Sequence, residues 1–276
     1  MKTVLMADRV RYERLNTAEL RETFLLDQLY APGEVRLNYL DLDRAVVGFT
    51  APLAEPIALP TYPELRAEFF TKRREVGVLN IGGSGTVTVR GKAWELDNLD
   101  VLYIGLGNPD IVFASNAAPA PAVFYLLSYP AHAAHPIALV RKANAAPVEL
   151  GSFETCNKRT VCKYIHLEGA RSCQLVMGVT HLAAGSNWNT MPPHTHMRRS
   201  EVYMYFNLPP AARVVHLMGP PDETRHLLVA NQQVALSPGW SIHAGVGTEA
   251  YSFCWGMGGE NQDYADMDPA PVDSLR

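Results

Sequence analysis

Short apolar runs rich in β-branched residues, divided by polar and glycine-containing segments, dominate the chain after residue 34. Such runs, separated by glycine-containing turns, are typical of strands in a sandwich or barrel and not of a sheet with crossover helices. Turns are expected at Gly82–Gly85 and at Arg90–Lys92. The runs predict strands at Val35–Tyr39, Ala45–Thr50, Val76–Ile81 and Thr86–Val89.

One helix is predicted before the first strands. Asn16 is followed three residues later by Glu19, the spacing of a capping box at a helix start. The apolar positions Leu20, Phe24, Leu25 and Leu29 continue this helix, which should end before Pro32-Gly33. The fold class is therefore β-dominated with a short N-terminal helix.

The two halves of the chain have the character of a degenerate repeat. Lys72–Asn80 aligns with Met197–Asn207 when Glu75 is placed on Glu201, and each segment precedes a turn-rich region and another apolar strand. An Ala- and Pro-rich stretch lies between the halves, and its His132 and His135 are expected to be incidental. The pattern predicts two β-barrels. The expected division is an N-terminal barrel at 1–130, a linker at 131–150 and a C-terminal barrel at 151–276.

The composition and net charge of the chain argue against some classes of function. The chain has 276 residues, 47% of them hydrophobic, with a net charge of −4. This balance provides no basic surface for nucleic acid or for an acidic membrane. No signal peptide and no stretch of about 20 apolar residues is evident. The cysteines, which we expect to be buried small hydrophobic residues in a reducing cytosol, are Cys156, Cys162, Cys173 and Cys254.

The strongest chemical signal is a set of metal-ligand residues. His194 and His196 share one face of an extended segment, because side chains at i and i+2 point the same way. Glu201 lies at odd spacing from His196, so a turn within Met197–Ser200 must precede a second strand. His243 follows the Pro238-Gly239 turn. Three imidazoles and one carboxylate suit Zn, Fe, Mn or Ni, and the residues alone do not choose among these metals.

The spacing of these residues resembles the two metal motifs of the cupin superfamily, although Trp240 occupies the position where the second motif has glycine. The whole chain is similar to the 5-keto-4-deoxyuronate isomerase family, the 4-deoxy-L-threo-5-hexosulose-uronate ketol-isomerases of pectin breakdown, which are bicupins. The segments that carry this similarity are Arg73–Gly83, Asn189–His196, Glu223–His226, Ser237–Gly247 and Trp255–Gln262.

The resemblance implies an aldose–ketose isomerase that converts 4-deoxy-L-threo-5-hexosulose uronate to 3-deoxy-D-glycero-2,5-hexodiulosonate. It also implies one zinc ion on His194, His196, Glu201 and His243, a cytoplasmic homohexamer, and a small sugar-acid substrate as the only partner besides other copies of the chain. The N-terminal barrel is expected to lack metal, since Glu68 and Phe70 stand where the alignment requires the two histidines of the first motif.

Several assignments stay open at this stage. The general base is unassigned, with candidates at Glu223, His226, Lys163, Glu260, Tyr203 and Tyr205. The substrate carboxylate can be bound by Arg198 and Arg199, unless these form a surface charge pair, and Arg159 or Lys163 are alternatives. The ligand set also fits a cupin dioxygenase that uses iron or nickel, and a non-catalytic bicupin that binds sugar or metal.

Overall fold

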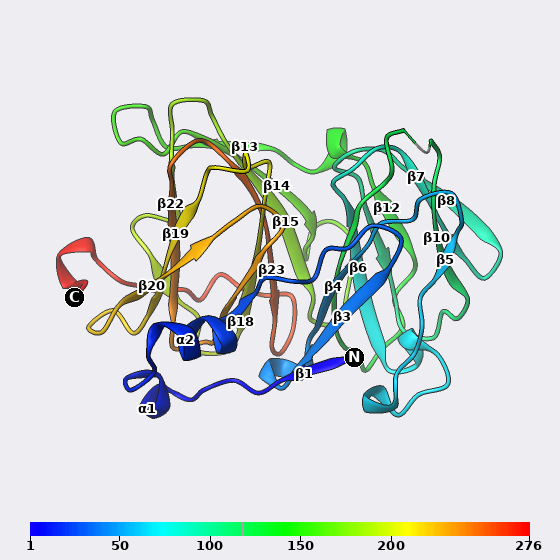
Figure 1. Ribbon diagram of the computed structural model, residues 1–276, viewed down its shortest axis with the longest axis horizontal. Helices are drawn as coiled ribbons and strands as arrows, with labels where there is room; N and C mark the ends of the chain where they lie inside the picture. Colours follow the sequence, from blue (N-terminus) through cyan, green and yellow to red (C-terminus); the bar gives the residue numbers. More distant parts are fainter. Residues whose placement is uncertain (118) are drawn as a thin grey trace. The chain divides into compact units, whose positions relative to one another are not determined.

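The computed structural model describes residues 1–117 and 119–276, and these residues form two compact units. The first unit consists of Met1–Val4, Gln28–Ala146 and Lys163–Met177. The second unit consists of Leu5–Asp27, Pro147–Cys162 and Gly178–Arg276. Each unit is built around two β-sheets, and Figure 1 labels most of their strands.

The first unit contains a seven-stranded and a four-stranded sheet. The larger sheet has the order β1 (Lys2–Val4), β3 (Val35–Leu40), β4 (Val46–Thr50), β11 (Phe124–Pro130), β6 (Arg74–Asn80), β9 (Val101–Ile104) and β12 (Ala138–Val140). The smaller sheet has the order β5 (Ile57–Ala58), β10 (Ile111–Ser115), β7 (Gly85–Val89) and β8 (Lys92–Leu96). Apolar side chains of both sheets, among them Val78, Val87 and Phe124, form one core.

The second unit repeats this arrangement. Its larger sheet has the order β13 (Val148–Leu150), β14 (Arg159–Ile165), β15 (Val176–Leu182), β23 (Ser252–Gly258), β18 (Ser200–Phe206), β21 (Val234–Ser237) and β2 (Leu25–Leu26). Its smaller sheet has the order β16 (Trp188–Asn189), β22 (Ile242–Gly247), β19 (Val214–Gly219) and β20 (Arg225–Val229). A two-stranded ribbon pairs β17 (His194–Thr195) with β24 (Asp268–Pro269).

The strand orders confirm the internal repeat. In the larger sheets, β4, β11, β6 and β9 correspond to β15, β23, β18 and β21. Glu75 on β6 and Glu201 on β18 therefore occupy equivalent positions, as the sequence alignment predicted. The four predicted strands are present as β3, β4, β6 and β7, with ends that differ by one or two residues. The β-dominated fold is confirmed.

The predicted helix start is confirmed, but its predicted end is wrong. Asn16 caps α2 (Thr17–Phe24) through a capping box with Glu19. The helix stops at Phe24, because Leu25 and Leu26 form β2, which pairs with β21 of the second unit. Pairing with a strand about two hundred residues downstream overrides a local helical pattern. A second short helix, α1 (Arg9–Tyr12), precedes α2.

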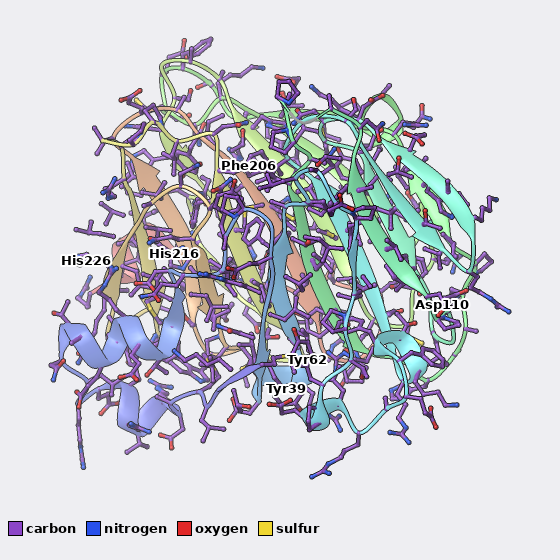
Figure 2. The ribbon with its side chains drawn as sticks, turned by 45° about the vertical axis from the view of Figure 1, so that its right-hand side comes forward. Tyr39, Tyr62, Asp110, Phe206, His216 and His226 are labelled. Carbon is purple, nitrogen blue, oxygen red and sulfur yellow. The ribbon has the colours of Figure 1, made fainter. Side chains whose placement is uncertain are left out.

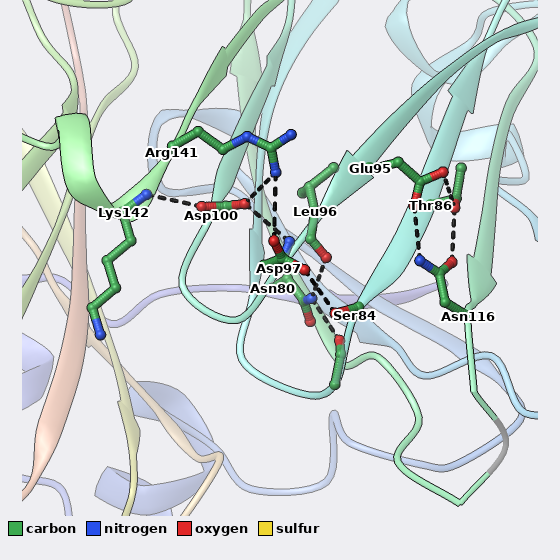
Figure 3. A network of polar contacts seen from close by, with 11 residues as sticks. Asn80, Ser84, Thr86, Glu95, Leu96, Asp97, Asp100, Asn116, Arg141 and Lys142 are labelled. Atoms are coloured by element: carbon green, nitrogen blue, oxygen red, sulfur yellow. Dashed lines mark hydrogen bonds and ion pairs between the residues drawn. The ribbon is translucent and has the colours of Figure 1, made fainter.

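The expected division at residues 130 and 150 treats each barrel as one continuous stretch of chain. In the structure, each unit is formed by three separate segments. Residues 5–27 contribute to the second unit, and residues 163–177 to the first. The segment expected as a linker also contains β12, which pairs with β9. Arg141 and Lys142, which follow β12, are bound to Asp100, as Figure 3 shows. The Asp100 carboxylate accepts hydrogen bonds from Arg141 Nη1 and from the backbone N–H of Lys142, each at 2.8 Å.

All four cysteines are free thiols. Cys162 and Cys254 are buried as expected, whereas Cys173 is half-buried and Cys156 is exposed, so the expectation of four buried cysteines is wrong. Cys156 lies in the turn before β14, where no core can form around it.

None of the helices in the described part of the chain has the length and apolar character required to cross a membrane.

Candidate metal centre

Four potential metal ligands from three strands of the second unit converge. His194 lies on β17, His196 directly follows it, Glu201 lies on β18 and His243 lies on β22. One ligand atom from each residue lies within 4.8 Å of every other. Residues that are remote in the chain therefore form a compact group of three imidazoles and one carboxylate, a set that can hold a metal ion.

The ligand atoms face one another at short range. His194 Nε2 lies 3.0 Å from His196 Nε2 and 3.1 Å from His243 Nε2. Glu201 Oε2 lies 2.7 Å from His243 Nε2 and 3.3 Å from His196 Nε2. Two atoms that each lie about 2 Å from the same metal ion stand roughly 3–4 Å apart, so these separations are compatible with a shared metal ion.

The local sequence explains how these residues meet. Met197 and Arg198 form a turn, and the Arg199 N–H donates to the His196 carbonyl at 3.1 Å, so the chain reverses before Glu201. This turn packs closely on Gly239, where a Cβ atom would lie 2.6 Å from the His196 carbonyl oxygen. The glycine therefore permits the approach of the first motif to the second. The turn predicted within Met197–Ser200 is confirmed.

The packing of Trp240 explains why a tryptophan stands where the second metal motif usually has glycine. Its ring lies 5.2 Å from the ring of Tyr12 and 6.2 Å from that of Phe24, both in edge-to-face geometry. Such aromatic pairs stabilise a packed arrangement beyond their buried area. The tryptophan thereby attaches α1 and α2 beside the strand that carries His243.

The polar atoms of the centre suit a cation. Glu201 Oε2 is buried, and its contacts with the two imidazoles do not have hydrogen-bond geometry, so it has no hydrogen-bond partner among the described residues. Burial alone would raise the pKa of Glu201, but His243 and His196 outweigh it and lower this pKa below its usual value. An ionised carboxylate facing three imidazole nitrogens is the donor set that a divalent cation takes.

His194 is held in the form that binds metal. Burial lowers the pKa of this imidazole to about 3, and His243 and His196 add to the effect. His194 is therefore neutral near pH 7, with a lone pair available on Nε2. Metal binding by histidine requires the neutral ring, so the ligand needs little proton release to become competent.

Buried aromatic and polar side chains lie next to the centre within the second unit. We call the group formed by Tyr203, Tyr205 and His216 the aromatic wall. Tyr203 and Tyr205 share the face of Glu201 on β18, and both are buried. The Tyr203 ring lies 5.4 Å from that of His243, and its hydroxyl lies 3.2 Å from Thr190 Oγ1. Burial raises the pKa of Tyr203 well above its usual value, and the charge of Glu201 raises it further, so the phenol keeps its proton.

His216 belongs to the same wall, although sequence reasoning missed it. It lies on β19 opposite Gly245, two residues beyond His243 on β22, and therefore on the face of His243. Its Nδ1 lies 2.8 Å from the Tyr205 hydroxyl, and its Nε2 is buried without a partner in residues 1–117 and 119–276. No second histidine follows it at metal-motif spacing, so the sequence carries no signal for it.

The buried His216 predicts a pH dependence of stability. Burial lowers the pKa of His216 to about 3, and His243 lowers it further, whereas an unfolded histidine has a pKa of about 6.5. Between these values the unfolded chain binds more protons, so stability rises with pH. Below pH 6.5 we expect this residue to reduce the unfolding free energy by about 1.4 kcal/mol per pH unit.

Urea unfolding at pH 7.0 and 5.5 with chelator present tests this dependence. His216→Gln should reduce the difference in unfolding free energy between these two pH values by about 1 kcal/mol, and His226→Gln, at an exposed position on the next strand, is the matched control. Equal slopes in the wild type and His216→Gln contradict the prediction.

The family model described as KduI/IolB family matches residues 38–271 of this chain. The chain belongs to the KduI/IolB family. Curated relatives agree: a protein of Lachnoclostridium phytofermentans is 51% identical over 260 residues, which are 94% of each chain. One of Kineococcus radiotolerans is 52% identical over 266 residues, 95% of each chain. Both are named 4-deoxy-L-threo-5-hexosulose-uronate ketol-isomerase, so the resemblance predicted from the sequence is confirmed.

Solved structures support the fold of this KduI/IolB family chain. An IolB-like protein from Salmonella typhimurium LT2 matches with a TM-score of 0.70 at 16% identity, over 87% of this chain and 94% of the other. A variant of the Bacillus subtilis oxalate decarboxylase OxdC matches with a TM-score of 0.54 at 12% identity, over 80% and 70% of the two chains. These likenesses confirm the predicted bicupin architecture.

The structure separates the arginines predicted to bind substrate. Arg198 forms ion pairs with Glu260 at 2.7 Å and Asp266 at 2.6 Å, in line with the alternative of a surface charge pair. Arg199 is buried and donates to Asn261 Oδ1 and to the Asp263 carbonyl. Both arginines thus fasten the segment after β23 beside the metal centre of this family member.

Three of the six candidates for the general base are exposed or paired with another side chain. His226 on β20 points to the face opposite to that of His216 and is exposed, and Figure 2 labels both residues. Glu223 is exposed, and Glu260 is occupied by Arg198. Lys163 is assigned to the first unit. Among the six candidates, Tyr203 and Tyr205 share the face of Glu201.

In the first unit, the position equivalent to Glu201 has a different environment. Glu75 is fully buried. Its carboxylate accepts hydrogen bonds from the Tyr103 hydroxyl at 2.8 Å and from the backbone N–H groups of Cys173, Gln174 and Leu175 at 2.7–2.9 Å. All of its acceptor sites face donors of the protein. This carboxylate anchors residues 163–177 within the first unit.

Proposed function

We propose that this chain is a zinc-dependent ketol-isomerase that converts 4-deoxy-L-threo-5-hexosulose uronate to 3-deoxy-D-glycero-2,5-hexodiulosonate in uronate catabolism. The zinc ligands are His194, His196, Glu201 and His243. The convergence of these four side chains on one point supports the proposal most directly. Membership of the KduI/IolB family and relatives named for this reaction support the substrate.

The reaction requires removal of a proton next to the aldehyde and return of a proton to the neighbouring carbon, and it needs no redox cofactor. A bound divalent metal supplies Lewis acidity for oxygens that gain negative charge, an effect of several kcal/mol. The residues of the chain supply the surroundings. Burial of Glu201, His196 and His243 excludes water from one side of the centre, which strengthens electrostatic interactions there.

Tyr203 is placed to act on the substrate. Its ring contacts that of His243, and its protonated hydroxyl can donate a hydrogen bond to a substrate oxygen next to the centre. A positioned proton donor or acceptor contributes typically about 10²–10⁴-fold to such a reaction. The base that removes the carbon-bound proton is not assigned.

Assembly and location are part of the proposal. The similarity to the family supports a homohexamer with a small sugar acid as the substrate, and it supports a structural, metal-free role for the first barrel. Four free thiols, one of them exposed, support a reducing cytoplasm.

Turnover of the deoxy-ketouronate, followed by NMR, tests the function. Metal-loaded protein should remove the signal of the C1 aldehyde hydrate and produce that of a ketose CH₂OH, without uptake of oxygen at an electrode. Chelator should stop turnover, and zinc should restore it. Oxygen consumption would support a cupin dioxygenase, and metal binding without any turnover would support a binding protein.

A further inference from the structure

Arg159 is a half-buried cation at the start of β14 in the second unit. Among the residues that the structure describes, its guanidinium donates one hydrogen bond, from Nη1 to the Asn157 carbonyl at 2.9 Å, which leaves most of its donors available. Burial lowers the pKa of Arg159, and the titratable groups that act on it are the phenols of Tyr203 and Tyr251. Within residues 1–117 and 119–276, no carboxylate forms an ion pair with Arg159.

Other arginines of the same unit differ from Arg159 in their partners. Arg198 has two carboxylates, and Arg225 donates to the carbonyls of Leu15 and Glu13. A cation removed from water is costly unless an anion or several acceptors compensate for it. Arg159 is therefore suited to an anion that comes from outside the chain.

The surroundings of Arg159 connect it to the metal centre. The carbonyl of Cys156, three residues before Arg159, accepts from the N–H groups of Asn187 and Trp188, each at 3.0 Å, so the chain entering β14 lies beside β16. β16 pairs with β22, the strand that carries His243. The Tyr251 hydroxyl accepts from Asn189 Nδ2 on β16 at 2.5 Å and donates to the carbonyl of Gly245, two residues beyond His243 on β22. The start of β14 is thus joined through β16 to the strand of a candidate metal ligand.

We propose that Arg159 binds the carboxylate of the sugar acid and makes the enzyme specific for uronates; this inference rests on the proposed function. In the substrate, the carboxylate and the reacting C1–C2 pair are at opposite ends of a six-carbon chain. A carboxylate-binding group must therefore stand apart from the metal but share a surface with it. A guanidinium binds carboxylate through two parallel hydrogen bonds, which fixes the orientation of the chain as well as its charge.

The test compares the uronate with its uncharged methyl ester. Arg159→Met should lower kcat/KM for the uronate by about 10²-fold, mainly through a higher KM, because a charge-assisted bidentate contact is lost. The same variant should change kcat/KM for the ester by less than about 3-fold. Arg159→Lys should recover part of the loss, since it restores the charge without the planar geometry.

Arg213→Met, which removes an exposed arginine of the same unit, is the matched control and should behave as the wild type. Metal content and circular dichroism of each variant establish that the centre and the fold are intact. Undiminished turnover of the uronate by Arg159→Met, or equal losses with uronate and ester, overturns the role of Arg159 and leaves the isomerase function standing. A wild type that binds zinc but turns over neither compound overturns both.

Discussion

Glu201→Ala is expected to lower kcat/KM for the deoxy-ketouronate by at least about 10³-fold and to remove tightly bound zinc. The carboxylate is the one anionic ligand of the group, and its Oε2 lies within 3.3 Å of two of the three imidazole nitrogens. Loss of the cation removes several kcal/mol of transition-state stabilisation, and about 4 kcal/mol corresponds to about 10³-fold in rate. Turnover by NMR and metal content by elemental analysis measure the two effects.

Glu249→Ala is the control for this variant, because Glu249 is an exposed glutamate of the same unit with no part in the centre. It should retain both zinc and turnover. Full zinc content in Glu201→Ala, together with wild-type turnover, would exclude Glu201 as a ligand and would remove the main support for the proposed mechanism.

Glu75→Ala is expected to reduce the free energy of unfolding by about 3–5 kcal/mol, the largest effect on stability that we predict. The substitution would leave three buried backbone N–H groups and the Tyr103 hydroxyl without their acceptor. An unsatisfied buried donor costs about 1–3 kcal/mol, because it loses its interaction with water and gains none in the protein. Urea unfolding followed by circular dichroism measures the difference.

Tyr103→Phe supplies a graded comparison, since it removes one donor to Glu75 and should cost about 1 kcal/mol. This milder variant keeps the test informative when Glu75→Ala does not fold. An unfolding free energy of Glu75→Ala within about 1 kcal/mol of the wild type would show that the four hydrogen bonds contribute little net stability.

The proximity of His194, His196 and Glu201 could be predicted from the sequence because its signal is local. His194 and His196 need only an extended backbone to share a face, and the odd spacing of Glu201 requires one turn, which the structure contains. His216 gave no such signal, since its place in the wall depends on pairing between β19 and β22. A residue that acts through tertiary position alone is not visible in one sequence.

The partners of Arg198 and the end of the helix were both beyond the reach of local sequence patterns. Arg198 stands beside the ligands in sequence, but its partners Glu260 and Asp266 are more than sixty residues downstream. The pattern of Leu25 favoured a helix, yet the chain pairs there with β21. Short-range patterns predict local conformation, whereas the partners of a charged side chain or an edge strand are set by the fold.

The alignment of Glu75 with Glu201 correctly identified equivalent positions but not their roles. Both carboxylates are buried on corresponding strands. One faces imidazoles and the other faces backbone N–H groups of a segment about one hundred residues away. The difference lies in what the rest of each unit brings to the carboxylate, which the glutamate itself does not encode.

The placement of residues 5–27 in the second unit has a consequence for synthesis on the ribosome. Leu25 and Leu26 find their strand partners only at Ala235 and Val234, so this early segment has to wait until most of the chain has been translated. Closing so long a loop is entropically unfavourable and slow. During that interval the nascent chain exposes Phe24, Leu25 and Leu26, which makes it a natural client for chaperones that bind apolar segments.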